Sequence, residues 1–175
     1  PIITPGPNLA GSGLGNNQYG KPALAYLALK DLLGDDLFKK CLHEFMSRWN
    51  GKHPIPWDMF YTFNQVSGKN LNWFWNAWFF SNNYMDLNLK GVTKTKGANN
   101  ITIANVGGMP TPVDLLVTYA DGTTEKIHKT PAIWQSNLKE TVITTKTNKT
   151  IQKVEFSEGI FMDADTSNDT WSSGK

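Results

Sequence analysis

The sequence has little of several features that often define a protein class. One cysteine, Cys41, stands among 175 residues, so no internal disulfide can form and zinc held by cysteines is excluded. Lys and Arg outnumber Asp and Glu by only 17 − 15 = 2, and no basic cluster marks a nucleic-acid footprint. No apolar run reaches the roughly 18 residues that a membrane-spanning helix needs. We therefore expect neither a nucleic-acid partner nor a membrane span.

The first residue, Pro1, follows no initiator Met and opens no signal segment, so we expect the chain to belong to a longer polypeptide. Three Asn-x-Ser/Thr sequons, at Asn100, Asn148 and Asn168, stand in a Thr- and Asn-rich sequence. These features favour a periplasmic or secreted location.

The first half of the chain has the spacing of helices. Residues 1–18 hold three Pro and four Gly and predict an irregular loop. A helix is predicted from Lys21, with Pro22 in its first turn and Gly34 at its end. Three further helices follow in the order of the chain: the first begins at Asp35 or Asp36, the second runs from Pro56 to Ser67-Gly68, and the third runs from Asn70 to Ser81. The sequence thus predicts about four helices in residues 1–83.

After Tyr84 the apolar residues recur at every second position, as in strands. The alternation is clearest at Leu87 and Leu89, at Ile101 and Ile103, and from Leu115 to Tyr119. Asp121-Gly122 between two such runs predicts a hairpin. Six or seven short strands of this kind predict an antiparallel β-sandwich in residues 84–175, and an α+β chain overall.

The aromatic residues are concentrated in the helical half. Trp73, Phe74, Trp75, Trp78 and Phe79 surround one predicted helix almost completely. A helix that is apolar on every side is normally buried on every side, which a four-helix unit cannot achieve alone. We therefore expect contact with the sandwich, with a further part of the polypeptide, or with both.

The sequence contains no complete motif for a metal site or for a catalytic nucleophile. His43-Glu44 lacks the second histidine of His-Glu-x-x-His, because Ser47 stands there, and His53 and His128 lie far along the chain. Cys41 falls on the apolar side of its helix and is expected to be a core thiol. The glycine-rich residues 11–15 lack the context of a nucleophile elbow or phosphate loop and predict a flexible loop.

Two further candidates remain open on the residues alone. Asp163, Asp165 and Asp169 could form a weak calcium site, or simply a solvated end of the chain. Tyr19 lies at the end of the predicted loop, just before the first helix, and could carry its phenol over a neighbouring surface. It could equally pack as an aromatic staple against Leu24 or Tyr26.

A resemblance adds to these observations. Residues 15–83 resemble the gluzincin aminopeptidases, the alanyl aminopeptidase family, through the order and spacing of several short motifs. These motifs are Gln18-Tyr19-Gly20-Lys21-Pro22-Ala23, the leucine-rich helix ending at Gly34, Phe38, Arg48-Trp49, Lys52-His53-Pro54-x-Pro56, Ser67-Gly68 and Leu71-x-Trp-Phe-x-x-x-Trp-Phe.

The resemblance implies that residues 1–83 end a thermolysin-like catalytic domain and that the β-sandwich of residues 84–175 follows it. It implies that Tyr19 donates its hydroxyl toward the scissile carbonyl, where such a donor is worth on the order of 10²–10³ in rate. It also implies that the zinc ligands, the general base and the group that holds the substrate's amino terminus lie upstream. The upstream catalytic domain would then be the partner of this chain, peptides the substrates and zinc the cofactor of the whole protein. The chain alone should neither bind catalytic zinc nor cleave peptides.

Two alternatives stay open. The chain could be a non-catalytic binding or adaptor module whose β-half aromatics, Tyr119, Trp134, Phe156 and Trp171, meet a carbohydrate or a protein. It could also belong to an inactive relative that keeps the fold and has lost the metal.

Overall fold

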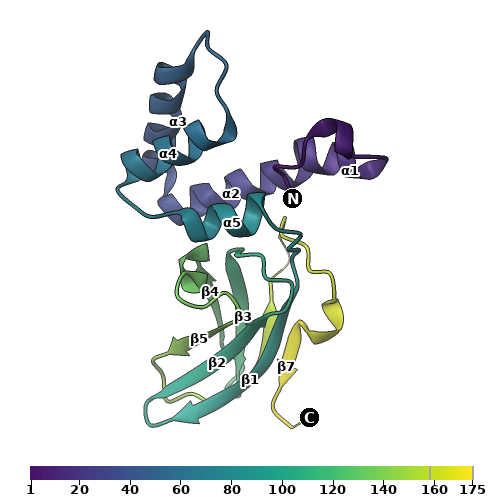
Figure 1. Cartoon of the computed structure of the whole chain (residues 1–175). Helices are drawn as coiled ribbons and strands as arrows, with labels where there is room; N and C mark the ends of the chain where they lie inside the picture. Colours follow the sequence, from purple (N-terminus) through teal and green to yellow (C-terminus); the bar gives the residue numbers. More distant parts are fainter. Residues whose placement is uncertain (158, 175) are drawn as a thin grey trace. The chain divides into compact units, whose positions relative to one another are not determined.

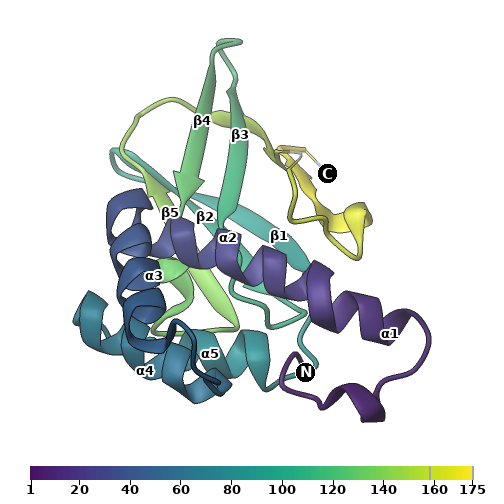
Figure 2. The same cartoon turned by 90° about the horizontal axis from the view of Figure 1, so that it is seen from above.

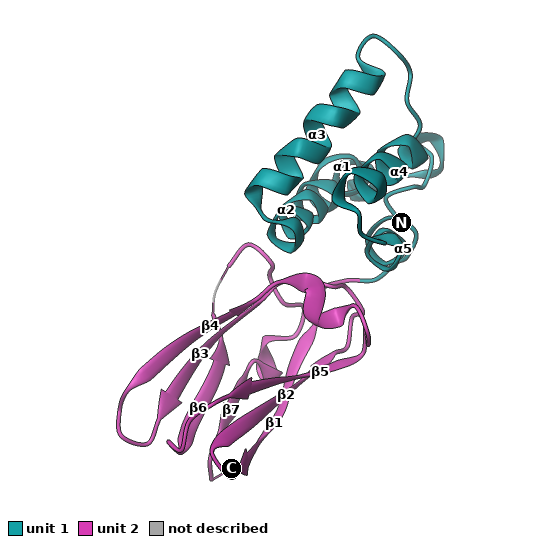
Figure 3. Cartoon of the chain, turned by 90° about the vertical axis from the view of Figure 1, so that its left-hand side faces the viewer, with its two compact units in different colours: residues 1–83 teal, residues 84–175 magenta. Residues whose placement is uncertain are grey.

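The computed structural model describes residues 1–157 and 159–174. The chain divides into two compact units, Pro1–Asn83 and Tyr84–Lys175 (Figure 3). The first is helical and the second is built from strands (Figure 1). This α+β arrangement, a helical bundle followed by an antiparallel two-sheet unit, confirms the fold class that the periodicity predicts.

Unit 1 contains the four predicted helices. They are α2 (Lys21–Leu33), α3 (Asp35–Trp49), α4 (Pro56–Ser67) and α5 (Asn72–Phe79). The expected signals end two of them: Gly34 follows α2 with φ +79°, and Gly68 follows α4 in the left-handed conformation with φ +66°. The last helix begins slightly later than predicted, and Asn70 Oδ1 accepts a hydrogen bond from the Asn72 amide at 3.1 Å.

The prediction of an irregular loop over residues 1–18 is wrong from Ser12 onward. A 3₁₀ turn, η1 (Gly6–Asn8), is followed by the helical turn α1 (Ser12–Gly15) and by the π-helical turn η2 (Asn16–Gly20). These turns lead without a break into α2, so that one helical run extends from Ser12 to Leu33 (Figure 2). Gly15 and Gly20 take ordinary helical φ angles of −62° here, so the glycines do not interrupt the helix although they lower its intrinsic propensity.

Aromatic rings fill the centre of unit 1. Phe60 stacks on Trp75 at a centroid distance of 4.8 Å and meets Phe79 edge to face at 4.9 Å. Phe63 and Phe74 are fully buried. Cys41 is also buried, as expected, and burial raises the pKa of its thiol, which makes it an inert core residue.

One amide side chain holds the turn between α4 and α5. Asn64 Oδ1 accepts hydrogen bonds from the Leu71 amide at 3.3 Å and from the Trp75 indole Nε1 at 3.0 Å. Its Nδ2 donates to Asn72 Oδ1 at 2.9 Å. Asn64 therefore satisfies a backbone donor and an indole donor that the turn leaves without helical partners.

Unit 2 consists of two antiparallel sheets. One sheet has the order β1 (Leu87–Thr95), β2 (Ala98–Asn105), β5 (Glu140–Thr145). The other has the order β4 (Thr124–Lys129), β3 (Val113–Tyr119), β6 (Ile151–Phe156), β7 (Thr170–Ser172). Every second residue of β2 is buried, and the same alternation recurs in β3, which leaves one face of each strand for the core.

Turn residues fix the register of these strands. Gly122 in the β3–β4 hairpin has φ +82°, as the Asp-Gly signal predicts. Gly107, just after β2, lies so close to residue 84 that an added Cβ would collide with the Tyr84 carbonyl oxygen. In the short 3₁₀ turn η3 (Pro131–Trp134), the buried Trp134 donates its indole N–H to the Thr111 carbonyl at 2.8 Å.

The alternative of a solvated chain end for Asp163, Asp165 and Asp169 is wrong in part. Asp163 Oδ2 accepts a hydrogen bond from the Leu87 amide at 2.7 Å, and the Phe156 amide donates to the Asp169 backbone carbonyl at 3.1 Å. The 3₁₀ turn η4 (Thr166–Asn168) leads into β7, which pairs with β6. These hydrogen bonds hold residues 163–172 against the strands of unit 2.

The charges of four aspartates influence one another along this segment. Burial, together with the charges of Asp163 and Asp165, raises the pKa of Asp86. Burial and the charges of Asp163, Asp165 and Asp86 raise the pKa of Asp169 to about 6. The Oδ1 atoms of Asp86 and Asp169 are buried without a hydrogen-bond partner among the described residues, whereas a hydrogen bond with the Tyr84 side chain acts on Asp86 in the opposite direction and lowers its pKa.

Replacing Asn64 by Ala should destabilise unit 1 by about 1–3 kcal/mol, because the Leu71 and Trp75 donors lose their acceptor. Chemical denaturation followed by helical circular dichroism measures this. Asn76→Ala is the matched control. Asn76 is exposed on α5, and its side chain makes no hydrogen bond among the described residues. We expect this substitution to change the free energy of unfolding by no more than about 0.5 kcal/mol. Equal losses in both variants would contradict the role of Asn64.

Unit 2 should be more stable at pH 5 than at pH 7. The folded pKa of Asp169, about 6, exceeds its ordinary 3.8, so the native state binds the proton more tightly than the unfolded chain does. This contribution is fully present below about pH 4 and is lost as the pH rises through about 6. Asp86 acts in the same direction. Urea unfolding followed by the amide signals of β6 and β7 measures the effect.

Asp169→Asn should flatten this pH dependence and raise the stability of unit 2 at pH 7, whereas Asp36→Asn, an exposed substitution in unit 1, should leave both unchanged. A wild-type stability that rises between pH 5 and pH 7 would show that the sign is wrong.

Candidate functional site

Tyr19 lies on a helical turn rather than at the end of a loop, which corrects the expected local structure. It belongs to the π-helical turn η2, in which the Lys21 amide donates to the Asn16 carbonyl five residues back. The side chain is 74% exposed, so it is not buried against Leu24 or Tyr26 as the alternative of an aromatic staple requires. No hydrogen bond to its hydroxyl occurs within residues 1–157 and 159–174. The phenol is therefore open to an external acceptor.

Two neighbours of Tyr19 are fixed while Tyr19 itself is open. Asn17 Nδ2 donates to the Pro1 carbonyl at 2.8 Å. Lys21 Nζ donates to the Ser81 and Asn83 carbonyls at 3.1 and 3.3 Å. Burial lowers the pKa of Lys21, and the two carbonyl oxygens are acceptors for its partly desolvated ammonium. The backbone under the phenol is thus held on both sides.

The three histidines are divided between the two units. His43 on α3 and His53 in the turn before α4 are both exposed. His128 belongs to unit 2, where its Nδ1 lies 2.8 Å from Asp114 Oδ1. In the part of the chain that the structure describes, no three His, Cys, Asp or Glu side chains come together so that they could hold a metal ion. The calcium site considered for Asp163, Asp165 and Asp169 is therefore not formed.

The glycine-rich residues 11–15 and Ser12 offer no nucleophile. They form the helical turn α1 rather than the expected flexible loop, and neither a histidine nor a carboxylate contacts Ser12 among the described residues. Cys41 is buried among apolar side chains and has the raised pKa already described. Neither residue has the neighbouring base that nucleophilic catalysis needs.

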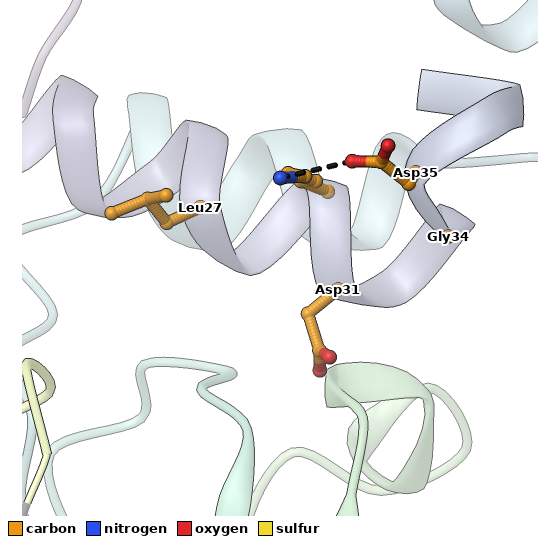
Figure 4. A pocket seen from close by; sticks show the side chains of 5 residues that line it. Leu27, Asp31, Gly34 and Asp35 are labelled. Carbon is orange, nitrogen blue, oxygen red and sulfur yellow. Dashed lines mark ion pairs between the residues drawn. The ribbon is translucent and has the colours of Figure 1, made fainter. Parts of the chain in front are cut away.

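A shallow depression lies where α2 ends and α3 begins (Figure 4). Leu27, Lys30, Asp31, Gly34 and Asp35 line it. Its main feature is an ion pair between Lys30 Nζ and Asp35 Oδ1 at 2.9 Å, with Lys39 Nζ on the other oxygen of Asp35 at 2.5 Å. Hydrogen bonds from Lys39 and Lys30 lower the pKa of Asp35. This carboxylate is ionised and satisfied, which suits a helix junction better than catalysis.

None of the four aromatic residues of unit 2 considered for binding is fully exposed. Tyr119 and Trp134 are buried, and Phe156 and Trp171 are half-buried. Tyr119 donates its hydroxyl to Glu125, and burial followed by that contact raises the Tyr119 pKa to about 12. Lys149 Nζ lies 5.4 Å from the centroid of the Tyr119 ring. These contacts give Tyr119 a role in the packing of unit 2.

The local sequence does not predict the roles of Asn17 and Lys21. Asn17 falls in the predicted loop, and Lys21 belongs to the motif around Tyr19 without a partner that the local sequence could indicate. Their partners are 16 and 60 or more residues away, so only the folded chain brings them together.

No helix in the described part of the chain is long and apolar enough to cross a membrane. No known family model matches the chain, and no curated protein matches it in sequence.

The fold of the chain is distantly similar to that of an aminopeptidase. The crystal structure of Legionella pneumophila aminopeptidase A in complex with aspartic acid is similar to it, with a TM-score of 0.56 and 17% sequence identity. The match covers 75% of this chain and 15% of that chain. Since 75% of 175 residues is about 131, more than either unit contains, the match includes residues of both units. At this identity the likeness shows the fold.

Tyr19→Phe should leave the stability of unit 1 within about 0.5 kcal/mol of the wild type, because the exposed hydroxyl has no partner among the described residues. Tyr26→Phe is the matched comparison. The Tyr26 hydroxyl donates to Met59 Sδ at 3.1 Å, and burial raises the pKa of this tyrosine. Loss of the hydroxyl should lower the free energy of unfolding by about 0.5–1.5 kcal/mol. Thermal and chemical denaturation distinguish the two, and a large loss for Tyr19→Phe would give Tyr19 a structural role.

Proposed function

We propose that this chain is the C-terminal part of a zinc aminopeptidase of the gluzincin class and that Tyr19 stabilises the transition state of peptide hydrolysis. The observation that carries the proposal is the exposed phenol on a fixed helical turn, in a chain with an aminopeptidase-like fold. The short motifs around Tyr19 resemble those of the gluzincin aminopeptidases, which favours this class over other hydrolases.

The chemistry that the phenol can supply is hydrogen-bond donation. When water attacks a peptide carbonyl, negative charge develops on the carbonyl oxygen, and a donor held about 3 Å from that oxygen lowers the barrier. A tyrosine hydroxyl is protonated at neutral pH and can donate. A fixed donor is more effective than solvent water because it does not reorganise during the reaction.

The residues described here do not fit a zinc site, because no three potential ligands converge. The metal of the proposed enzyme, whose role there is to activate the attacking water, would be held by residues outside this sequence. The 175-residue chain by itself should therefore release no amino acid from a peptide.

An apolar surface on unit 1 supports a partner domain of the same polypeptide. Ile55, Trp57 and Tyr61, on and just before α4, are exposed, and Phe80 after α5 meets the Trp57 ring at 5.9 Å. The chain spans only 15% of the aminopeptidase that it resembles. The proposed occupant of this surface is the upstream catalytic domain, which would cover side chains that are costly to leave in water.

Unit 2 has a supporting role in this proposal. Tyr119 and Trp134 are buried in its core, which disfavours these two residues as the binding surface of a carbohydrate- or protein-binding module. An extracytoplasmic location, periplasmic or secreted, is part of the proposal and is supported by the sequons, of which Asn148 is exposed.

In the complete polypeptide, Tyr19→Phe should lower kcat for an aminoacyl arylamide by about 10²–10³, the usual loss for one donor to a developing oxyanion. KM and zinc content should change little, because the ring stays in place and no metal ligand is touched. Met46→Leu is the control, since Met46 is an exposed side chain of unit 1 on α3 and has no proposed part in the reaction or in the apolar surface. Wild-type turnover in Tyr19→Phe would remove Tyr19 from the mechanism.

A further inference from the structure

The backbone that carries Tyr19 departs from a regular α-helix. The turn Asn16–Gly20 is π-helical, and Pro22 follows it inside the continuous run from Ser12 to Leu33. A proline inside an α-helix has no N–H to donate, and its ring clashes with the carbonyl four residues back, here that of Gln18. The wider π turn, in which Lys21 bonds to Asn16 instead of Asn17, provides the room that Pro22 needs.

The anchors of this turn lie on one side of the helix and Tyr19 on the other. Asn17 and Lys21 are four residues apart and therefore share a face. Tyr19 is midway between them, which directs it to the opposite face. The anchored face is held by three hydrogen bonds to backbone carbonyls, and the other face presents a side chain that is 74% exposed.

Lys21 is the stronger of the two anchors. Its ammonium donates to two carbonyls of the segment that follows α5, those of Ser81 and Asn83. Asn17 bonds only to Pro1, at the end of the described sequence. Fixing Lys21 fixes the end of the π turn against a distant part of unit 1, two residues from the phenol.

We propose that Pro22 and Lys21 are positioning residues for Tyr19: Pro22 imposes the π turn and Lys21 fixes it to the backbone after α5, so that the phenol projects from the helix in one direction. The inference rests on the proposed function of Tyr19. Positioning of this kind matters in catalysis because a displacement of about 1 Å can cost on the order of 10²-fold in rate.

The structural part is tested on the 175-residue chain. In Pro22→Ala, the Lys21 amide should exchange its Asn16 acceptor for Asn17, giving a regular α-helix through Tyr19. Solution NMR detects this as loss of the contacts between residues five apart and gain of those between residues four apart. A π turn that persists in Pro22→Ala would overturn the role of Pro22.

The functional part is tested in the complete polypeptide. Lys21→Met should lower kcat about tenfold at nearly unchanged KM and zinc content, because the phenol is misplaced but the substrate-binding groups are not. Lys21→Arg keeps a cation with several donors and should restore most of the turnover. Failure of Lys21→Arg to restore it, with both variants folded, would count against positioning through the carbonyls.

A double substitution separates this inference from the proposed function. If Lys21 acts through the phenol, Lys21→Met should cost nothing further in a Tyr19→Phe background, a strong departure from additivity. An equal loss in both backgrounds would overturn the positioning role. If Tyr19→Phe itself has wild-type kinetics, the proposed function fails; if Tyr19→Phe is slow while Lys21→Met and Pro22→Ala are not, only the positioning inference fails.

Discussion

The ammonium of Lys21 joins the beginning of α2 to the backbone that leaves α5, 60 and 62 residues later in the chain. Burial lowers the pKa of this lysine, and the two carbonyl oxygens accept hydrogen bonds that replace part of the lost hydration of its ammonium. Those carbonyls lie just beyond the helix end, where backbone acceptors commonly lack helical partners. The hydrogen bonds of Lys21 therefore satisfy both the ammonium and the two carbonyl oxygens. The direction of the turn before α2 depends on these bonds.

Local signals predicted most of the helices and strands. Gly34 and Gly68 end their helices through positive φ angles, a property of glycine that needs no distant partner. The alternation in β2 and β3 likewise follows from which residues face the core. The failures occur where composition and tertiary context disagree. Residues 12–18 look irregular because of their glycines, yet they continue into the helix α2.

The candidate site could be predicted only in its central residue. Tyr19 was singled out by its place before a helix and by a family resemblance, whereas composition gave it no more weight than any other tyrosine. The partners of Lys21 and Asn17 are set by the path of the chain, which no local pattern encodes. The aspartates of unit 2 show the same limit. Asp163 and Asp169 are recognisable in the sequence as acidic residues, but Asp86, 77 positions before Asp163, comes near them only in the folded unit, where the adjacent Leu87 amide donates to Asp163.

A phenol on a helical turn and a phenol at a loop tip differ in what their ordering costs. A loop must lose backbone freedom each time its side chain engages a partner, at roughly 1–2 kcal/mol for each residue fixed. In this chain the backbone under Tyr19 is already fixed by helical hydrogen bonds and by the bonds of Asn17 and Lys21, so that only the side-chain torsions remain to be ordered. A donor contributes more to catalysis the less it must move when charge develops on the substrate. The helical turn that carries Tyr19 is therefore better suited to an oxyanion donor than the loop predicted from the sequence.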